Sequence, residues 1–586
     1  MSPHESLRES SGKARVSHNL GCDINVAARK PSWIVRQGTS FAHMTQALAS
    51  QRERSNTWIA HMLTAIERQA SLALAAFIML YVAVLFFGLT FKYFNWAQGY
   101  DQIDYQQSIW NTTQGRFLEI SHYRHTDHLW GMDFIPAILL IVPFYALFPS
   151  ALTLNFFQAL FMALGALPIY GIARDRFDGS RLAGLGWALV YLLYPSLWFV
   201  TMSAPWQPRT LAIPALLGAF FFLQRATFQR AGIREWGAYL GLLALALTTR
   251  TDVSLVVVSF GILAALWRVG WRWALPPLIM GLAWFYLSTN VIVPSFYLPD
   301  YQVREGEIGA VTEGDYTEVW PGKSPQLAYY SHLGDSAGAI LWTIVSRPID
   351  VLRLMFTPDK LVYLTLMLLP LALLPLLAPD VAILAAPPLA MNLLSLRPFQ
   401  ITVREQYQAL VIPGLILAAI IGAARLWSWW QARSGRTRGA HVSGIQERRT
   451  RSCQAAIFMI SAIGIAAVTN LAYRNPVATT VLYRESPERL AAMDRLAALI
   501  PPDAPLGVTS FLAPRMMPRR FIYYVPPDES FPPLERAEYL FIDIRAAALR
   551  TERHRDFIQR LRESRRWQVI AEEEDLLVLR QAHQAP

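Results

Sequence analysis

The feature that most limits how this chain can fold is a series of long apolar runs separated by polar segments. The first run, residues 71–90, reads SLALAAFIMLYVAVLFFGLT and contains no charged residue. A helix needs about 20 apolar residues to cross the hydrocarbon core of a bilayer. Only 16% of the 586 residues are charged, whereas about 25% is usual in a soluble protein. The sequence therefore predicts a polytopic α-helical membrane protein.

We expect about eleven membrane-spanning helices from these runs. They cover residues 71–90, 151–173, 182–202, 210–224, 237–249, 253–267, 273–294, 360–378, 380–395, 406–424 and 454–474. Residues 134–149, FIPAILLIVPFYALFP, are also apolar, but they carry three prolines and lie one short turn before the next run. We predict that they form an interfacial or re-entrant helix instead of a span.

The distribution of Lys and Arg over the loops predicts the orientation. With 134–149 not spanning, loops 174–181, 225–235, 268–272 and 425–452 lie on one side and hold 15 Lys and Arg in 52 residues. The segments 91–133, 203–209, 298–359 and 396–405 lie on the other side and hold 10 in 122. Basic residues concentrate on the cytoplasmic side of membrane proteins. The N-terminus is therefore expected inside, and the second group of segments outside.

Three regions follow from this pattern. Residues 1–70 are polar, lack periodicity and show no apolar signal region, so we expect a disordered cytoplasmic tail. Residues 71–474 form the membrane domain, with outer loops at 91–150 and 298–359. Residues 475–586 are expected to form a small extracytoplasmic α/β domain. Within it, 489–500 and 553–564 read as helices, 506–510, 521–525 and 539–544 as strands, and 567–580 as a hairpin.

The formal net charge of +11 would suggest nucleic acid as a partner in a soluble protein. Here the basic residues gather in cytoplasmic loops, so we predict no nucleic-acid binding. The only two cysteines, Cys22 and Cys453, lie far apart and fit no metal or redox spacing.

Polar residues suited to chemistry collect in the segments assigned to the outer side. The first outer loop begins with Asp101 and Asp104, which are three residues apart and would share a face on a helix. The remaining candidates, in chain order, are His125, Asp127, His128, Arg209, Arg250, Asp252, His332, Arg404, Gln406 and Tyr407. Such a polar mouth on an apolar bundle suits a lipid-linked substrate. An acid could take a proton from an acceptor hydroxyl, and a guanidinium could stabilise a departing phosphate.

Each candidate also has a purely structural interpretation. Two acids in a wet loop are often only solvated. The segment HTDHLWGMD could bind zinc or manganese, so a divalent metal is possible, although the spacing does not establish one and we assign no metal ligand. Arg250 and Asp252 lie where two spans meet, and they could form an ion pair or grip an anionic headgroup.

Several stretches resemble a family of bacterial membrane proteins known as domain of unknown function 2079. They include YDQIDYQQSIWNTTQGRFL, HTDHLWGMDFIPAILL, RTDVSLVVVSFG, PPLAMNLLS and ALIPPDAPLGVTSFLAPRMMPRRFIYYVP, and the resemblance covers about residues 75–580. The family in turn is similar to the GT-C superfamily of integral-membrane glycosyltransferases. The resemblance implies a GT-C-like bundle in the bacterial inner (plasma) membrane and a polyprenyl-phosphate-linked sugar as donor.

The resemblance also implies roles for particular residues. A carboxylate in the first outer loop serves as base in the superfamily, and Asp101 matches it by its tyrosine–aspartate context, with Asp104 as second choice. Before the fourth span, where a histidine–proline–glutamate motif is expected, the chain reads QPR, Gln207 to Arg209. A catalytic role there is not expected, and Arg209 becomes a candidate to face the phosphate.

Three functions remain open on the sequence. The first is a membrane glycosyltransferase that moves a sugar from a polyprenyl-phosphate donor to an acceptor on the outer side. The second is a lipid or polysaccharide transporter or flippase, although the chain shows no internal repeat of the kind common in transporters. The third is a non-catalytic envelope assembly protein. An enzyme should bring Asp101, Arg250 and residues 404–407 together in space.

Overall fold

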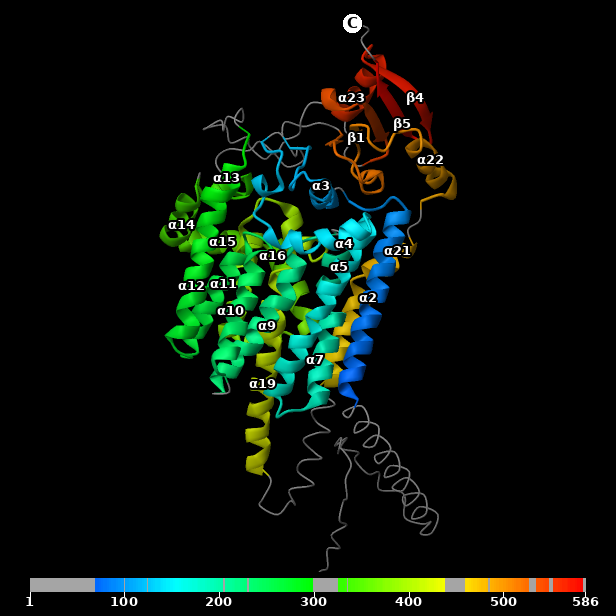
Figure 1. Ribbon diagram of the computed structural model, residues 1–586. Coiled ribbons are helices and arrows are strands. Elements are labelled where there is room, and N and C mark those ends of the chain that lie inside the picture. The colour runs from blue at the N-terminus through cyan, green and yellow to red at the C-terminus, as the bar shows by residue number, and fades with distance from the viewer. Residues whose placement is uncertain are drawn as a thin grey trace, which may run out of the picture.

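The protein folds as a bundle of helices with a mixed sheet at one end, in a computed structural model (Figure 1). The structure describes residues 69–99, 101–123, 125–203, 206–228, 231–298, 325–334, 336–437, 459–482, 485–525, 534–546 and 552–582. The expected tail, residues 1–70, thus lies outside the described residues except for its last two.

Five helices in the described part of the chain are long and apolar enough to cross a membrane. They are α2 (Ala70–Phe94), the continuous pair α5 (Ala151–Leu164) and α6 (Ala166–Arg176), α9 (Arg209–Thr227), Trp271–Ser295, and Val411–Arg433 of α19 (Val411–Thr437). The segment Trp271–Ser295 comprises α12 (Trp271–Tyr286), a π-helical turn over Leu287–Ile292, and α13 (Val293–Ser295). Each of the five overlaps a predicted span.

Two further spans are bent pairs, which would raise the number to seven. The predicted span 182–202 is α7 (Arg181–Leu193) and α8 (Pro195–Ser203), which meet at 44°. Residue Tyr194 before Pro195 has an extended backbone, because a residue preceding proline is disfavoured in the α conformation. The second pair is α15 (Pro348–Met355) and Pro358–Leu371, which begins with α16 (Pro358–Leu368), at 67°.

Shorter helices occupy the other predicted spans. They are α10 (Ile233–Leu247), α11 (Val253–Leu266), α17 (Pro379–Ala382), α18 (Ala386–Leu394) and a helix over residues 459–472. Between α16 and α17 the chain is broken by Pro370, Pro375 and Pro379, with positive φ at Ala372 and Leu373. The total of eleven spans stays a prediction. One apolar core cluster, running from Leu74 to Val477, holds the bundle together.

The two loops predicted to lie outside, here called the first and second outer loops, form a layer at one end of the bundle. The first contains α3 (Gln102–Thr113), a 3-10 turn over Leu129–Gly131, another over Pro136–Leu140, and α4 (Val142–Leu147). Residues 134–149 therefore contain only short helical turns. They pack beside α3 and the α10–α11 turn, where Ala137 N donates to Thr248 O over 3.0 Å. The second loop contains a 3-10 helix over Pro325–Leu333, followed by α14 (Ala337–Ser346).

The C-terminal part contains a five-stranded sheet in the order β2–β1–β3–β5–β4. It follows α21 (Pro476–Leu482) and α22 (Pro487–Ala497). The strands are β1 (Leu506–Val508), β2 (Ile522–Tyr524), β3 (Tyr539–Asp543), β4 (Trp567–Glu573) and β5 (Leu576–Gln581), and α23 (Glu552–Glu563) precedes the final antiparallel hairpin. Strands β2, β1 and β3 are parallel.

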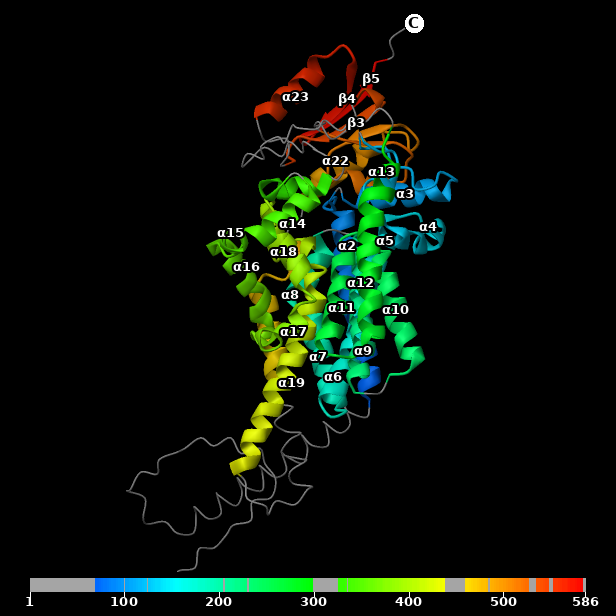
Figure 2. The same cartoon turned by 90° about the vertical axis from the view of Figure 1, so that its left-hand side faces the viewer.

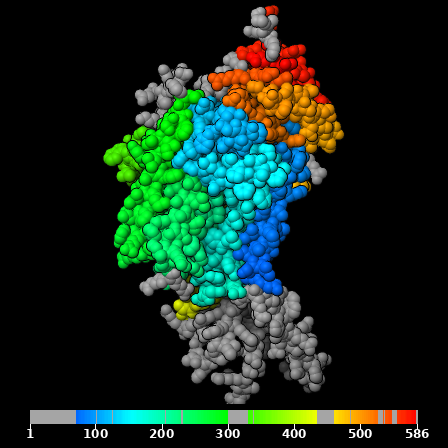
Figure 3. Space-filling view, in the orientation of Figure 1, coloured from blue at the N-terminus to red at the C-terminus, as the bar shows by residue number. Residues whose placement is uncertain are grey.

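The sheet sits over the same end of the bundle as α3, in both views (Figures 1 and 2). Figure 3 shows the C-terminal residues directly against the first outer loop, drawn in light blue and cyan. Trp96 and Ile103 from this region belong to the apolar core beneath the sheet. The first outer loop is therefore held between the bundle and the C-terminal sheet.

Candidate active site

The two carboxylates of the first outer loop have different surroundings. Asp101 occupies the position just before α3 and is exposed to solvent. Gln406 Nε2 donates a hydrogen bond to its Oδ2 over 3.0 Å. Asp104, in the first turn of α3, is buried. One of its oxygens meets Nε2 of His122, and the other accepts a bond from the Tyr123 hydroxyl over 3.2 Å.

The surrounding protein changes the acidity of Asp101. Desolvation is the largest cause and raises the pKa of its carboxyl, Asp104 raises it further, and the hydrogen bond from Gln406 lowers it. Arg397 and Arg250 are near enough to lower the pKa as well. Solvent also reaches Asp101, so its carboxyl can exchange a proton with the solvent.

A second group of charges lies at the turn between α10 and α11. Arg250 Nε lies 2.9 Å from Asp133 Oδ2 and 3.6 Å from Asp252 Oδ2. Arg209, at the start of α9, approaches Asp252 at 3.7 Å. Thr251 also binds Asp133, through its backbone N over 3.1 Å and its hydroxyl over 2.6 Å. The ion pair foreseen for Arg250 and Asp252 is present, but within a network of two arginines and two aspartates.

Burial and neighbouring charges act on this network in opposite directions. Burial alone would lower the pKa of the Arg250 guanidinium, but the carboxylates of Asp133 and Asp252 raise it above its usual value. Burial raises the pKa of Asp133, which Arg250 counteracts. Removing one member would leave a buried charge with fewer partners.

The segment 404–407 connects the two groups. Gln406 binds Asp101, and the ring of the next residue, Tyr407, lies 5.9 Å from the Arg209 guanidinium carbon. The Tyr407 hydroxyl accepts a hydrogen bond from Arg397 Nη1 over 3.0 Å, and Arg397 lies 4.0 Å from the centroid of the Tyr329 ring. The structure thus brings Asp101, Arg250, Gln406 and Tyr407 into one polar cluster, which also contains Arg209 and Arg397.

Glu405 lies beside this cluster and adds another carboxylate. Desolvation is the largest cause raising its pKa, and the charge of Asp101 raises it too, whereas Lys92 lowers it. Lys92 lies in the last turn of α2, and its Nζ donates a hydrogen bond to Met202 O over 2.7 Å. Asp133, Arg397 and Glu405 are among the polar residues of the segments predicted to lie outside, but no motif in the sequence marked them as site residues.

The HTDH segment has a structural arrangement of its own. His125 is buried, and desolvation lowers its pKa to about 4. His128 Nδ1 accepts a bond from Trp130 N over 3.1 Å, and its ring stacks on Phe296 at 4.2 Å. Asp127 is exposed. Within the described residues, no group of three or more His, Cys, Asp or Glu side chains is placed to hold a metal ion.

Two other candidates lie apart from the cluster. His332 is exposed, and its pKa is lowered by desolvation and by Lys360. Arg404 is exposed, and its guanidinium makes no hydrogen bond or ion pair with any residue that the structure describes. Neither side chain is joined to Asp101 through contacts in the described part of the chain.

The fold and the site together define a polytopic membrane protein with a carboxylate and several guanidinium groups at one end of its bundle. The chain belongs to the family described as Predicted membrane protein (DUF2079), whose model matches residues 92–578. No curated protein matches the chain significantly.

The solved structures to which the chain is similar include ArnT from Cupriavidus metallidurans bound to undecaprenyl phosphate. It is 16% identical, with a TM-score of 0.49, over 87% of this chain and 98% of that one. The apo state of the same protein is 15% identical with a TM-score of 0.46 over the same shares. The oligosaccharyltransferase AglB from Archaeoglobus fulgidus, in complex with an inhibitory peptide and a dolichol-phosphate, is 12% identical. Its TM-score is 0.41, over 81% of this chain and 70% of that one.

Proposed function

We propose that this protein is a membrane glycosyltransferase that transfers a sugar from a polyprenyl-phosphate donor to an acceptor hydroxyl on the outer side of the membrane. The observation that carries the proposal is the meeting of an accessible carboxylate, Asp101, with three guanidinium groups. They come from segments far apart in the chain and are joined through Gln406 and Tyr407.

The chemistry assigns one task to each side of the cluster. Ionised Asp101 takes the proton of the acceptor hydroxyl, whose oxygen attacks the anomeric carbon with inversion. The bond from that carbon to the phosphate oxygen breaks, and the electron pair leaves with the polyprenyl phosphate. Arg250, with Arg209 and Arg397 nearby, holds the phosphate and stabilises the charge it gains. No step of this reaction requires a metal. Membrane lipids would surround the apolar surface of the bundle.

The buried network supports this division of tasks. Asp133 and Asp252 fix Arg250 and Arg209 in place, so the guanidinium groups are oriented before a donor arrives. Preorganised charges act more strongly than groups that must reorient during the reaction. Gln406 and Tyr407 are neighbours in the chain, so they hold Asp101 at a fixed distance from the guanidinium groups.

The test is a transfer assay on the purified protein with a polyprenyl-phosphate-linked sugar, comparing Asp101→Asn with wild type. Asparagine has nearly the same shape but cannot accept the proton. Loss of a general base typically costs about 10²–10⁴ in rate, so turnover should fall by that factor while donor binding persists. Asp104→Asn should cost less, because Asp104 is buried against His122.

Asp350→Asn is the matched control, since Asp350 is an exposed aspartate of α15 whose ion pair, among the residues that the structure describes, is with Arg353 alone. It should leave transfer unchanged. Full activity in Asp101→Asn would remove Asp101 from the mechanism. Movement of the lipid across the membrane without any sugar transfer would instead favour a flippase.

A further inference from the structure

The edge of the C-terminal sheet is closed by the first outer loop. Strand β2 is an edge strand of the sheet, and an edge strand leaves backbone groups without a partner. The hydroxyl of Ser121 satisfies two of them at once. It donates to Ile522 O over 2.8 Å and accepts from Ile522 N over 2.9 Å. The Ser121 side chain thus makes the two hydrogen bonds that a neighbouring strand would make with Ile522.

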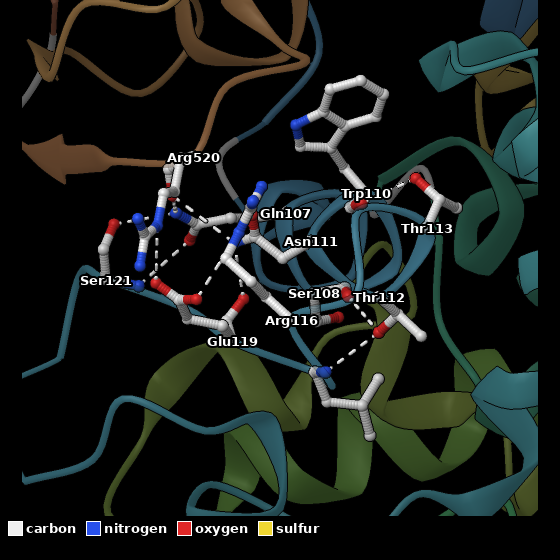
Figure 4. A network of polar contacts seen from close by, with 11 residues as sticks. Gln107, Ser108, Trp110, Asn111, Thr112, Thr113, Arg116, Glu119, Ser121 and Arg520 are labelled. Atoms are coloured by element: carbon white, nitrogen blue, oxygen red, sulfur yellow. Dashed lines mark hydrogen bonds and ion pairs between the residues drawn. The ribbon is translucent and has the colours of Figure 1, made fainter.

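The same loop is bound to α3 and to Arg520, two residues before β2. Gln107, fully buried in α3, donates from Nε2 to Arg520 O over 2.5 Å and to Ser121 Oγ over 2.8 Å (Figure 4). Its Oε1 accepts from Ser121 N over 3.1 Å. The Arg520 side chain reaches Glu119 at 3.1 Å. Helix α3, the loop and β2 therefore form one hydrogen-bonded unit.

This unit continues to the first turn of α3. His122 follows Ser121, and its Nδ1 lies 3.3 Å from Gln107 Oε1 while its Nε2 meets Asp104. Between Asp101 and Asp104, the fully buried side chain of Ile103 enters the apolar core under the sheet. The turn that bears Asp101 is thus held from the C-terminal part by one apolar and one polar connection.

The guanidinium groups of the site are held differently. Arg250 and Arg209 are fixed by Asp133 and Asp252, which belong to the membrane bundle and its first outer loop. Within the part of the chain that the structure describes, the ion pairs and hydrogen bonds of these four residues do not involve the sheet. A disturbance at β2 should therefore displace the base without disturbing the phosphate side.

We propose that Ser121, Gln107 and His122 are positioning residues through which the C-terminal sheet sets the place of Asp101. The proposal rests on the glycosyltransferase function proposed above. It gives the C-terminal domain a role in turnover, as the part that holds the first turn of α3 against the site.

The test compares Ser121→Ala and Gln107→Leu with wild type in the transfer assay. Both substitutions remove hydrogen bonds while leaving the apolar contact of Ile103 intact. A misplacement of about 1 Å can cost up to about 10²-fold in rate. The maximal rate kcat should therefore fall between about 10- and 10²-fold, with the KM for the donor within about two-fold of wild type. Ser121→Thr keeps the hydroxyl and should restore most of the loss.

Arg562→Gln is the control within the same domain, because Arg562 of α23 pairs with Glu572 on the exposed surface. It should leave both kcat and KM unchanged. An unchanged kcat in Ser121→Ala and Gln107→Leu would overturn the proposal. So would equal changes in Ser121→Ala and Ser121→Thr, or a rise in KM that accounts for the whole loss.

A readout without activity separates this proposal from the proposed function. Amide hydrogen exchange over Gln102–Thr113 should be faster in Ser121→Ala than in wild type or in Arg562→Gln, because α3 loses hydrogen bonds that connect it to β2. If the wild-type protein transferred no sugar, the proposed function would fail. The exchange rates would still show whether the contacts of Ser121 and Gln107 hold α3. Exchange identical in all variants would show that the sheet does not hold α3.

Discussion

Asp101 and Asp104 lie three positions apart, yet the fold gives them different surroundings. Asp101 is exposed and bound to Gln406, whereas Asp104 is buried against His122 and Tyr123. The family resemblance ranked Asp101 before Asp104. The spacing of the two acids could not show this difference in surroundings, because Gln406 is 305 positions away from Asp101, and no local spacing encodes a contact of that range.

The transfer rate should fall at acidic pH as Asp101 becomes protonated. This fall is the acidic limb of the pH profile. A general base works only when ionised, so the rate falls as pH drops through its pKa. That pKa is raised above the ordinary 3.8, and the limb should therefore lie above that pH. The bond from Gln406 lowers the pKa, so Gln406→Leu should move the limb to still higher pH.

Gln114→Leu is the control for this profile, since Gln114 is exposed just after α3 and its side-chain amide donates, among the described residues, only to the Thr113 hydroxyl. It should leave the limb in place. A limb that stays fixed in Gln406→Leu would show that another group controls it.

Arg250→Lys should weaken donor binding several-fold while the protein remains folded. Lysine keeps the positive charge beside Asp133 and Asp252 but loses the planar fork that binds a phosphate through two bonds. Binding of a polyprenyl phosphate to the purified variant measures the effect. The control is Arg425→Lys, which replaces the arginine of a comparable ion pair, with Asp380 at 2.7 Å. This variant should bind the donor as wild type does. Unchanged affinity in Arg250→Lys would leave Arg250 as a partner of the two aspartates only.

The helices follow the apolar runs, but their breaks follow the prolines. The runs predicted spans at 182–202, 360–378 and 380–395, and the structure interrupts the helices in this part of the chain at Pro195 and at Pro370, Pro375 and Pro379. These residues were visible in the sequence, and the known effect of proline on the preceding residue could have indicated the breaks. The bend angle of 44° between α7 and α8 depends on neighbouring helices and was not accessible from the sequence.

Close packing of α11 on α12 depends on Gly281. A Cβ at this position would lie 2.6 Å from Ser254 O and 2.7 Å from Val258 Cγ2. Gly281→Leu should therefore push the two helices apart and destabilise the protein by about 1–3 kcal/mol. Thermal unfolding in detergent would show this as a lower midpoint temperature.

Gly241→Leu on α10 serves as the control, since a Cβ there meets nothing within 4 Å. Its unfolding midpoint should equal or exceed that of wild type. Equal midpoints for both variants would mean that the α11–α12 contact contributes nothing to stability.

The molecule has chemically different ends. One end carries the polar cluster around Asp101 together with the C-terminal sheet. The other carries ion pairs between basic loops, with Arg225 at 3.3 Å from Asp175 and Arg425 at 2.7 Å from Asp380. The amphipathic helices and short strands of residues 489–580 could be read from the sequence because each has a clear local period. The docking of the sheet on α3 could not, because it depends on single contacts such as Ser121 with Ile522.

We expect the end with the sheet to face outward and the basic loops to face the cytoplasm. The contacts of Ser121 with Ile522 place the first outer loop and the C-terminal sheet on one side, whatever the number of spans. Loops 174–181 and 225–235 meet at the opposite end through the pair of Asp175 and Arg225, and basic loops remain inside. A reporter active only in the cytoplasm should therefore be silent when fused after Pro586 and active when fused after Gly179. Strong activity after Pro586 would reverse the topology and move the proposed site to the cytoplasmic side, where a donor presented at the outer face could not reach Asp101.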